Sequence, residues 1–133
     1  MEEKKLTHVD EKGSPGMVDV SGKAVTSRVA IASGKIVVGE VVMRHLKEKG
    51  FQSKKGSILQ TAIIAGTMSV KKTYEAIPFC HQIPISGCKI EIEDSVDAFQ
   101  IMCSVKTQSQ TGVEMEALQG VATAALTLSL IHI

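Results

Sequence analysis

Apolar and polar residues alternate along three segments of the chain, which predicts three β-strands. We expect an extended segment over residues 17–31, punctuated by the Ser33-Gly34 pair. Apolar and polar residues alternate strictly over residues 85–93 and again over residues 99–105. This pattern is typical of an antiparallel hairpin with one face exposed to solvent. The apolar residues of one parity are Val25, Val29 and Ile31 in the first strand, Cys88, Ile90 and Ile92 in the second, and Phe99, Ile101, Cys103 and Val105 in the third.

Apolar residues recur at three- and four-residue spacing elsewhere, which predicts helices over residues 35–49, 57–76 and 113–128. Gly66 inside the second helix indicates close packing rather than a break, and residues 107–112 are expected to form a loop. The order β-α-α-β-β-α predicts an α+β fold, a sandwich with helices packed on one face of an antiparallel sheet. The expected apolar face of the last helix comprises Leu118, Val121, Ala122, Ala125 and Leu126.

Composition is consistent with one folded domain. The chain has 133 residues, of which 44% are hydrophobic and 22% charged, so extensive disorder is not expected. Residues 1–16 are polar and contain the turn sequence Gly13-Ser14-Pro15-Gly16, so we expect a flexible leader there and a single domain over residues 17–133. The formal net charge of +1 argues against a protein whose main task is non-specific nucleic-acid binding.

The sequence also predicts a cellular compartment. No apolar run reaches the roughly 18 residues that a transmembrane helix needs, and the residues after Met1 lack the apolar region of a secretory signal. The odd number of cysteines, at positions 80, 88 and 103, favours a reducing compartment over a disulfide framework. We therefore expect a cytoplasmic protein that binds neither membranes nor nucleic acid.

Two short segments carry residues capable of chemistry. Residues 54–57 (KKGS) precede a predicted helix, whose N-terminal N–H groups and dipole could bind phosphate with help from the lysines. The same pattern also describes a solvated charge pair before a Ser N-cap. His81, in the connector Phe79-Cys80-His81, is placed for proton transfer, although a hydrogen-bonded loop histidine fits equally well. The cysteines and His81 lack the paired spacing of structural zinc, so no metal is expected.

A third segment opens the last predicted helix. Residues 111–114 (TGVE) match a capping box, with Thr111 as the N-cap and Glu114 at the third helical position. A helix turns about 100° per residue, which puts Glu114 and Glu116 about 200° apart. The two carboxylates therefore cannot form a close pair, but each could face a different ligand group or subunit.

Taken together, these segments indicate a family more specifically than any one of them does alone. Residues 17–24 (MVDVSGKA) resemble the opening motif of molybdenum cofactor biosynthesis protein C, the cyclic pyranopterin monophosphate synthase family. The resemblance continues in that family's order and covers residues 6 to about 127. The further matching segments are Lys55-Gly56, residues 62–66 (AIIAG), Lys71-Lys72-Thr73, residues 77–81 (IPFCH) and residues 111–118 (TGVEMEAL).

The resemblance implies a fold, an assembly and a reaction. The fold is a ferredoxin-like α+β sandwich that assembles as a homohexamer, a trimer of dimers, with the active site at a subunit interface. The reaction is that of a lyase in molybdenum cofactor biosynthesis. It rearranges a cyclic dihydro-GTP intermediate, 3',8-cyclo-7,8-dihydroguanosine triphosphate, into the pterin product cyclic pyranopterin monophosphate with release of pyrophosphate. The family needs no metal or organic cofactor.

The resemblance also implies roles for individual residues. Lys55 and His81 are expected to be catalytic together with Glu114, and His81 is also expected to bind substrate. Clustered cations suit a triphosphate, and a ring rearrangement needs acid–base groups. The remaining candidates are Phe79, Cys80, Met115 and Glu116 as pocket-lining residues, and Lys23, Arg28 and Lys71 as residues that hold the triphosphate.

The C-terminal end departs from the family pattern. The family has a catalytic aspartate and, three residues later, a lysine, and direct carry-over places Leu130 and Ile133 at those positions. The closing residues 128–133 (LSLIHI) look like an in-frame translation of a sequencing adapter, so we expect the natural gene to continue with the family sequence. The alternative is a catalytically impaired homologue that acts only as a nucleotide-binding or oligomerisation module.

Overall fold

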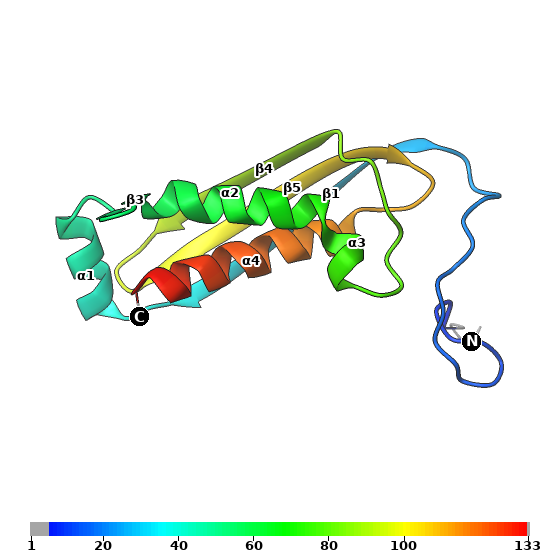
Figure 1. Cartoon of the computed structure of the whole chain (residues 1–133), viewed down its shortest axis with the longest axis horizontal. Helices are drawn as coiled ribbons and strands as arrows, with labels where there is room; N and C mark the ends of the chain where they lie inside the picture. The colour runs from blue at the N-terminus through cyan, green and yellow to red at the C-terminus, as the bar shows by residue number, and fades with distance from the viewer. Residues whose placement is uncertain (1–5, 133) are drawn as a thin grey trace.

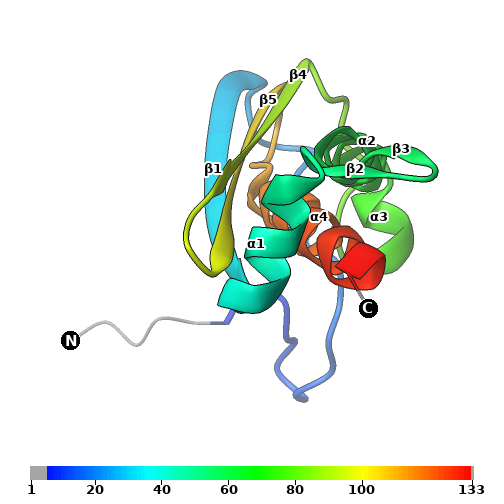
Figure 2. The ribbon, with the colours of Figure 1, turned by 90° about the vertical axis from the view of Figure 1, so that its left-hand side faces the viewer.

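The protein folds into two layers, a β-sheet and a layer of helices on one face of it (Figures 1 and 2). The computed structural model describes residues 6–132, and side chains over residues 6–131, so Ile133 and the first five residues of the expected leader lie outside it. The sheet has the order β1-β5-β4, and both strand pairs are antiparallel. This arrangement confirms the predicted α+β sandwich. Its strands are β1 (Thr26–Val37), β4 (Gly87–Asp94) and β5 (Ala98–Ser109).

The hairpin of β4 and β5 confirms the predicted alternation. Ile90 pairs with Cys103, and the inward-facing residues of β5 are buried while Gln100 and Met102 are exposed. The strand continues beyond the predicted boundary at residue 107, because residues 106–109 find hydrogen-bonding partners in β1. The predicted loop over residues 107–112 is therefore wrong in its first half.

The first strand lies later in the chain than predicted. Residues 17–25 contain no strand, and β1 instead includes residues 35–37, which the pattern assigned to a helix. Ala30, Ala32 and Gly34, which face the helices in the middle of β1, are small, whereas Val29 and Ile31 point away from the helices and are 56% and 66% exposed. A Cβ atom on Gly34 would lie only 2.6 Å from Val121 Cγ1, so the helix layer packs directly on the strand backbone. That close approach leaves no room for a large side chain at position 34.

The first two predicted helices both form, with shifted boundaries. α1 (Glu40–Glu48) starts five residues later than predicted because β1 takes the preceding segment. The second predicted helix is divided into α2 (Ile58–Lys71) and the short α3 (Thr73–Ala76). Ser57 caps α2, since its hydroxyl accepts a hydrogen bond from Gln60 N at 3.2 Å, which confirms the predicted Ser N-cap. A small hairpin of β2 (Gln52–Ser53) and β3 (Gly56–Ser57) links α1 to α2.

Two glycines allow α2 to pack closely against α4 (Glu114–His132), which runs antiparallel to it (Figure 1). A Cβ atom on Gly66 would lie 2.9 Å from the carbonyl oxygen of Gly120. The prediction that Gly66 marks close packing is therefore confirmed.

The buried face of α4 differs from the predicted one. Its fully buried residues include Ala117 and Ala124, whereas Leu118 and Leu126 are 51% and 70% exposed. Of the predicted apolar face, Val121 is buried and Ala125 partly buried. Small residues face the sheet because the helix approaches both α2 and β1 so closely. Within residues 6–132, none of the helices combines the length and apolarity that crossing a membrane requires.

Candidate functional site

A pocket of about 450 Å³ lies where the chain leaves α3 and where α4 begins. Two segments that are far apart in the sequence meet there, the connector after α3 and the first turn of α4. Ile77 and Ile83 add apolar surface, so the lining is largely apolar with a few ionisable groups. From the two segments, the predicted site residues in the pocket are Phe79, Cys80, His81, Glu114, Met115 and Glu116.

Glu116 is the most deeply buried ionisable group of this pocket. Its side chain is on the first turn of α4, and the residue is only 3% exposed. Oε1 accepts a hydrogen bond from the Cys80 thiol at 3.4 Å, and Oε2 has no hydrogen-bonding partner among the described residues. A buried carboxylate oxygen without a partner is costly, which is typical of a group that awaits a ligand.

Burial changes the acidity of both partners. Removal from water raises the pKa of Glu116 above its usual 4.5, and the nearby carboxylate of Glu114 raises it further. The Cys80 thiol and the field of His81 act in the opposite direction. Burial also raises the pKa of Cys80 to about 11, and the adjacent Glu116 adds to this effect. Cys80 therefore stays a neutral hydrogen-bond donor near pH 7 rather than a thiolate nucleophile.

His81 connects the pocket to the N-terminal segment. Its Nε2 lies 2.6 Å from the carbonyl oxygen of Val18. A carbonyl oxygen can only accept, so Nε2 carries the proton and Nδ1 is left as the basic nitrogen of the neutral ring. Nδ1 is therefore the ring nitrogen that can accept a proton while the bond to Val18 is kept.

Glu114 folds back over the turn that precedes α4. Its carboxylate occupies the space that a Cβ atom on residue 112 would need, so a larger residue there would displace the Glu114 carboxylate. The helix begins at Glu114, which puts Val113 rather than Thr111 at the capping position, and the predicted capping box is wrong. Thr111 and Gly112 instead line the pocket.

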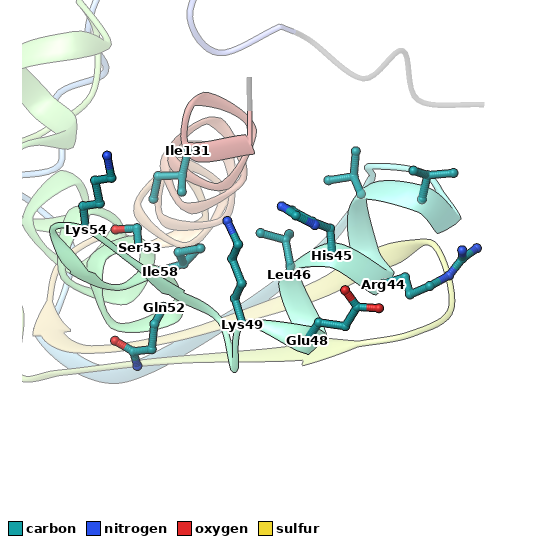
Figure 3. Close-up of a pocket in the computed structure, with 12 residues that line it drawn as sticks. Arg44, His45, Leu46, Glu48, Lys49, Gln52, Ser53, Lys54, Ile58 and Ile131 are labelled. Carbon is teal, nitrogen blue, oxygen red and sulfur yellow. The ribbon is translucent and has the colours of Figure 1, made fainter.

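A second hollow, of about 580 Å³, lies at the opposite end of the helix layer (Figure 3). It is bounded by α1, the β2–β3 hairpin and the last turns of α4, which contribute Ile131. We call it the basic groove, because its ionisable side chains are basic except for Glu48. In Figure 3, Lys49 points toward the side of Ile131, whereas Arg44 points away from the groove. The basic side chains are Arg44, His45, Lys49 and Lys54.

The remaining predicted cationic residues do not line the pocket. Lys55 is exposed in the β2–β3 turn, at the start of α2, whereas His81 follows the other end of that helix. The 14 residues of α2 span about 21 Å, so one chain cannot bring these two side chains together. Lys23 and Lys71 are exposed. Arg28 donates from Nε to Ser109 O and from Nη2 to Gln110 O, both at 3.4 Å, and so supports the turn before α4.

One pocket residue escaped the sequence analysis, as did a second residue close to His81. His8 lines the pocket although it lies in the segment interpreted as a leader. Asp19 lies near His81, and its pKa is lowered mainly by the backbone N–H of Ser21, then by the Ser21 hydroxyl, with a small contribution from His81. A lone histidine in a polar leader gives no signal in the sequence, because only the folded chain returns it to the pocket. No group of three or more His, Cys, Asp or Glu side chains within the described residues is arranged to hold a metal ion.

Comparison with known proteins identifies the family. The model of the MoaC family matches residues 17–129, which include most of the pocket. The chain belongs to the MoaC family. A cyclic pyranopterin monophosphate synthase of Xanthomonas campestris pv. campestris (strain 8004) is 50% identical over 125 residues, which cover 93% of this chain and 76% of the relative. A protein of the same name from Streptomyces avermitilis is 49% identical over 124 residues, covering 93% of this chain and 72% of the relative.

A third relative places the MoaC family sequence in a larger protein. The molybdenum cofactor biosynthesis bifunctional protein of Synechocystis sp. (strain ATCC 27184 / PCC 6803 / Kazusa) is 47% identical over 129 residues. These cover 92% of this chain but 37% of that protein. The resemblance on which the sequence analysis relied is thus confirmed.

Proposed function

We propose that this chain is a cyclic pyranopterin monophosphate synthase, a lyase of molybdenum cofactor biosynthesis. Its substrate is 3',8-cyclo-7,8-dihydroguanosine triphosphate, which it rearranges to cyclic pyranopterin monophosphate with release of pyrophosphate. Membership of the MoaC family and about 50% identity to two synthases support this activity. The observation in the molecule that supports it best is the unpartnered Oε2 of Glu116 in the pocket.

The chemistry of the pocket fits the heterocyclic end of such a substrate. A guanine-derived ring carries adjacent N–H donors, and these are the partners that a buried carboxylate oxygen lacks. Phe79 and Met115 provide apolar surface for the faces of the ring. The neutral Cys80 thiol holds Oε1 of Glu116 and leaves Oε2 directed at the ligand. His81 Nδ1 is then the candidate proton acceptor, with Glu114 at the rim.

The basic groove fits the other end of the substrate. A triphosphate carries several negative charges, and the groove is lined by His45, Lys49 and Lys54, the last of which adjoins Lys55 in the chain. Lys55 and His81 lie at opposite ends of the helix layer of one chain, so a site that contains both residues needs two copies. We infer that two chains pack through their helix layers around a twofold axis, which brings the groove of one copy to the pocket of the other.

The exposed face of the helix layer supports this pairing. Between the two hollows, α2 exposes Ile64 and Met68, and α4 exposes Leu118, Leu126 and Leu130. Large apolar side chains gathered on one face of a protein are typical of an interface between subunits. α2 and α4 lie side by side and run in opposite directions, so both helices can contribute to one such interface (Figure 1).

The finer features implied by the family resemblance belong to the same proposal. We expect the fold to be ferredoxin-like, since the strand order β1-β5-β4 and the intervening helices agree with that topology. We expect three such dimers to form a hexamer, with no metal or organic cofactor. Three free cysteines suit a cytoplasmic enzyme. Size-exclusion chromatography with light scattering distinguishes monomer, dimer and hexamer.

The direct test is conversion of the purified cyclic dihydro-GTP intermediate, followed by mass spectrometry of the pterin and by pyrophosphate release. We expect turnover by the chain to be strongly reduced relative to the Xanthomonas protein, because Leu130 and Ile133 replace the expected acid and base. The double variant L130D/I133K is expected to raise turnover at least tenfold. No pterin from either the chain or this variant would refute the proposed reaction.

The alternative function, a nucleotide-binding or oligomerisation module, rests on Leu130. Leu130 is 72% exposed on α4, next to the Ile131 that lines the basic groove, and it carries no titratable group. A binding module is expected to bind GTP through the pocket and to lose at least tenfold in affinity in E116Q, without any turnover. Turnover in the L130D/I133K variant alone would show that the pocket is catalytically competent and that only these positions limit it.

A further inference from the structure

The N-terminal segment reaches the pocket at His8 and is hydrogen-bonded to the domain at Val18 and Ser21. Residues 6–22, which we call the strap, begin with a small hairpin in which Val9 forms an antiparallel bridge with Pro15. Gly16 N donates to the carbonyl oxygen of His8 at 2.9 Å, which closes the hairpin at its base. Asp10 Oδ1 accepts from the backbone N–H groups of Lys12 and Ser14, at 2.9 and 2.8 Å, and fixes the turn.

Side chains of the domain fasten the rest of the strap. His81 Nε2 bonds to Val18 O, and Gln110 Nε2 donates to Ser21 O at 3.4 Å. Asp19 Oδ1 accepts from Ser21 N at 2.8 Å, and this bond shapes the chain between the two attachments. His81 itself lines the pocket, and Gln110 directly precedes the lining residues Thr111 and Gly112, so both attachments hold the strap beside the pocket.

With the strap attached in this way, His8 lines the pocket and its ring makes no hydrogen bond within the described residues. His8 lines the same pocket as Glu114 and Glu116, and its ring nitrogens bond no other residue within the described part of the chain. His81, the other imidazole of the pocket, has already committed Nε2 to the strap. The two carboxylates of the pocket repel the oxygens of an anionic nucleotide, whereas the imidazole of His8 can donate a hydrogen bond to one of those oxygens.

We propose that His8 is a substrate-contacting residue, which hydrogen-bonds an oxygen of the nucleotide where the pocket opens. This inference rests on the proposed function, because it takes the ligand to be a GTP-derived nucleotide. His81 is then also a positioning residue for His8, since it anchors the strap at Val18.

The test is equilibrium binding of GTP to the full chain, measured by titration calorimetry, for a set of single variants. H8A is expected to weaken binding about tenfold, and H8Q, which keeps a hydrogen-bond donor, about threefold, as expected for one hydrogen bond to a charged group. S14A is the matched control, because it alters the same hairpin while keeping both backbone bonds of residue 14, and it should bind within twofold of the unaltered chain.

A second measurement separates contact from indirect structural effects. The ring Cε1–H resonance of His8 should shift on GTP addition with the same midpoint as the calorimetric titration. D10A, which removes the turn carboxylate, should weaken binding less than H8A. Equal affinity of H8A and S14A, with a weakened E116Q, would overturn the role of His8 and leave the proposed function intact. Failure of the unaltered chain to bind GTP would overturn the inference about His8, whereas the proposed function is decided separately by the pterin assay.

Discussion

The Cys80 thiol donates to Glu116 Oε1 at 3.4 Å, and this hydrogen bond joins two segments 36 positions apart in the sequence. It satisfies one carboxylate oxygen of a residue that is only 3% exposed, and it leaves the other oxygen for a ligand. The bond also explains why the connector after α3 and the first turn of α4 form one pocket.

Glu116 is expected to make the protein less stable as the pH rises. The folded-state pKa of Glu116 is raised above its usual 4.5, so the folded chain holds the proton more tightly than the unfolded chain. The free energy of unfolding therefore falls as the pH rises from about 4.5 through the folded-state pKa, and is constant in this respect above it.

Urea unfolding between pH 4 and pH 8 measures this effect. In E116Q the fall should be smaller, and the variant should be more stable than the unaltered chain at pH 8. E93Q is the matched control, because Glu93 is exposed on β4. Parallel stability curves for the unaltered chain and E116Q would contradict the prediction.

Cys80 is expected to react slowly with alkylating reagents at neutral pH. A pKa raised from 9.0 to about 11 lowers the thiolate fraction at pH 8 about a hundredfold. Iodoacetamide labelling, followed by peptide mass spectrometry, should therefore be slow at pH 8 and accelerate up to about pH 11. E116Q should speed labelling at pH 8, because the repelling carboxylate is gone. Rapid labelling of Cys80 in the unaltered chain at pH 7 would be inconsistent with the pocket described above.

A site shared between two copies predicts complementation. K55A and H81A each remove one half of the site, so each variant alone should bind GTP at least tenfold more weakly. After subunit exchange in an equal mixture, about one quarter of the sites should regain normal affinity, because half of the dimers are mixed and each has one intact site. Calorimetric stoichiometry measures this fraction, and native mass spectrometry confirms the exchange. Exchange without any recovery would mean that both residues act within one chain or at separate sites.

The contact between α2 and α4 predicts a stability effect. G66A adds a methyl group 2.5 Å from Ile90 Cδ1 and 2.9 Å from Gly120 O, and the backbone oxygen cannot easily move. Overpacking of this kind costs about 1–3 kcal/mol, which should appear as a lower urea midpoint with an unchanged slope. G22A is the control, because nothing lies within 4 Å of a Cβ atom there. Equal midpoints for the two variants would show that the helix pair can separate at no cost.

The spacing of apolar residues and the positions of turn-forming residues were sufficient to predict the fold class from the sequence. The strict alternation of residues 85–93 and 99–105 predicted the β4–β5 hairpin, and Ser57 predicted the start of α2. The family motifs placed Cys80, His81 and Glu116 among the pocket residues, because the motif residues act together and follow a fixed order in the chain. These features depend on local geometry or on whole motifs, and a single sequence contains both.

Tertiary structure alone decided which apolar residues are buried. Hydrophobicity cannot tell that Ala30 and Ala117 face the core while Ile31 and Leu118 face out, because that choice depends on how closely neighbouring elements approach. Glycines at positions 34, 66 and 120 let β1, α2 and α4 come together, and the larger side chains are turned outward as a result. The separation of Lys55 from His81 and the return of His8 to the pocket also follow from the path of the chain in space, which no local pattern encodes.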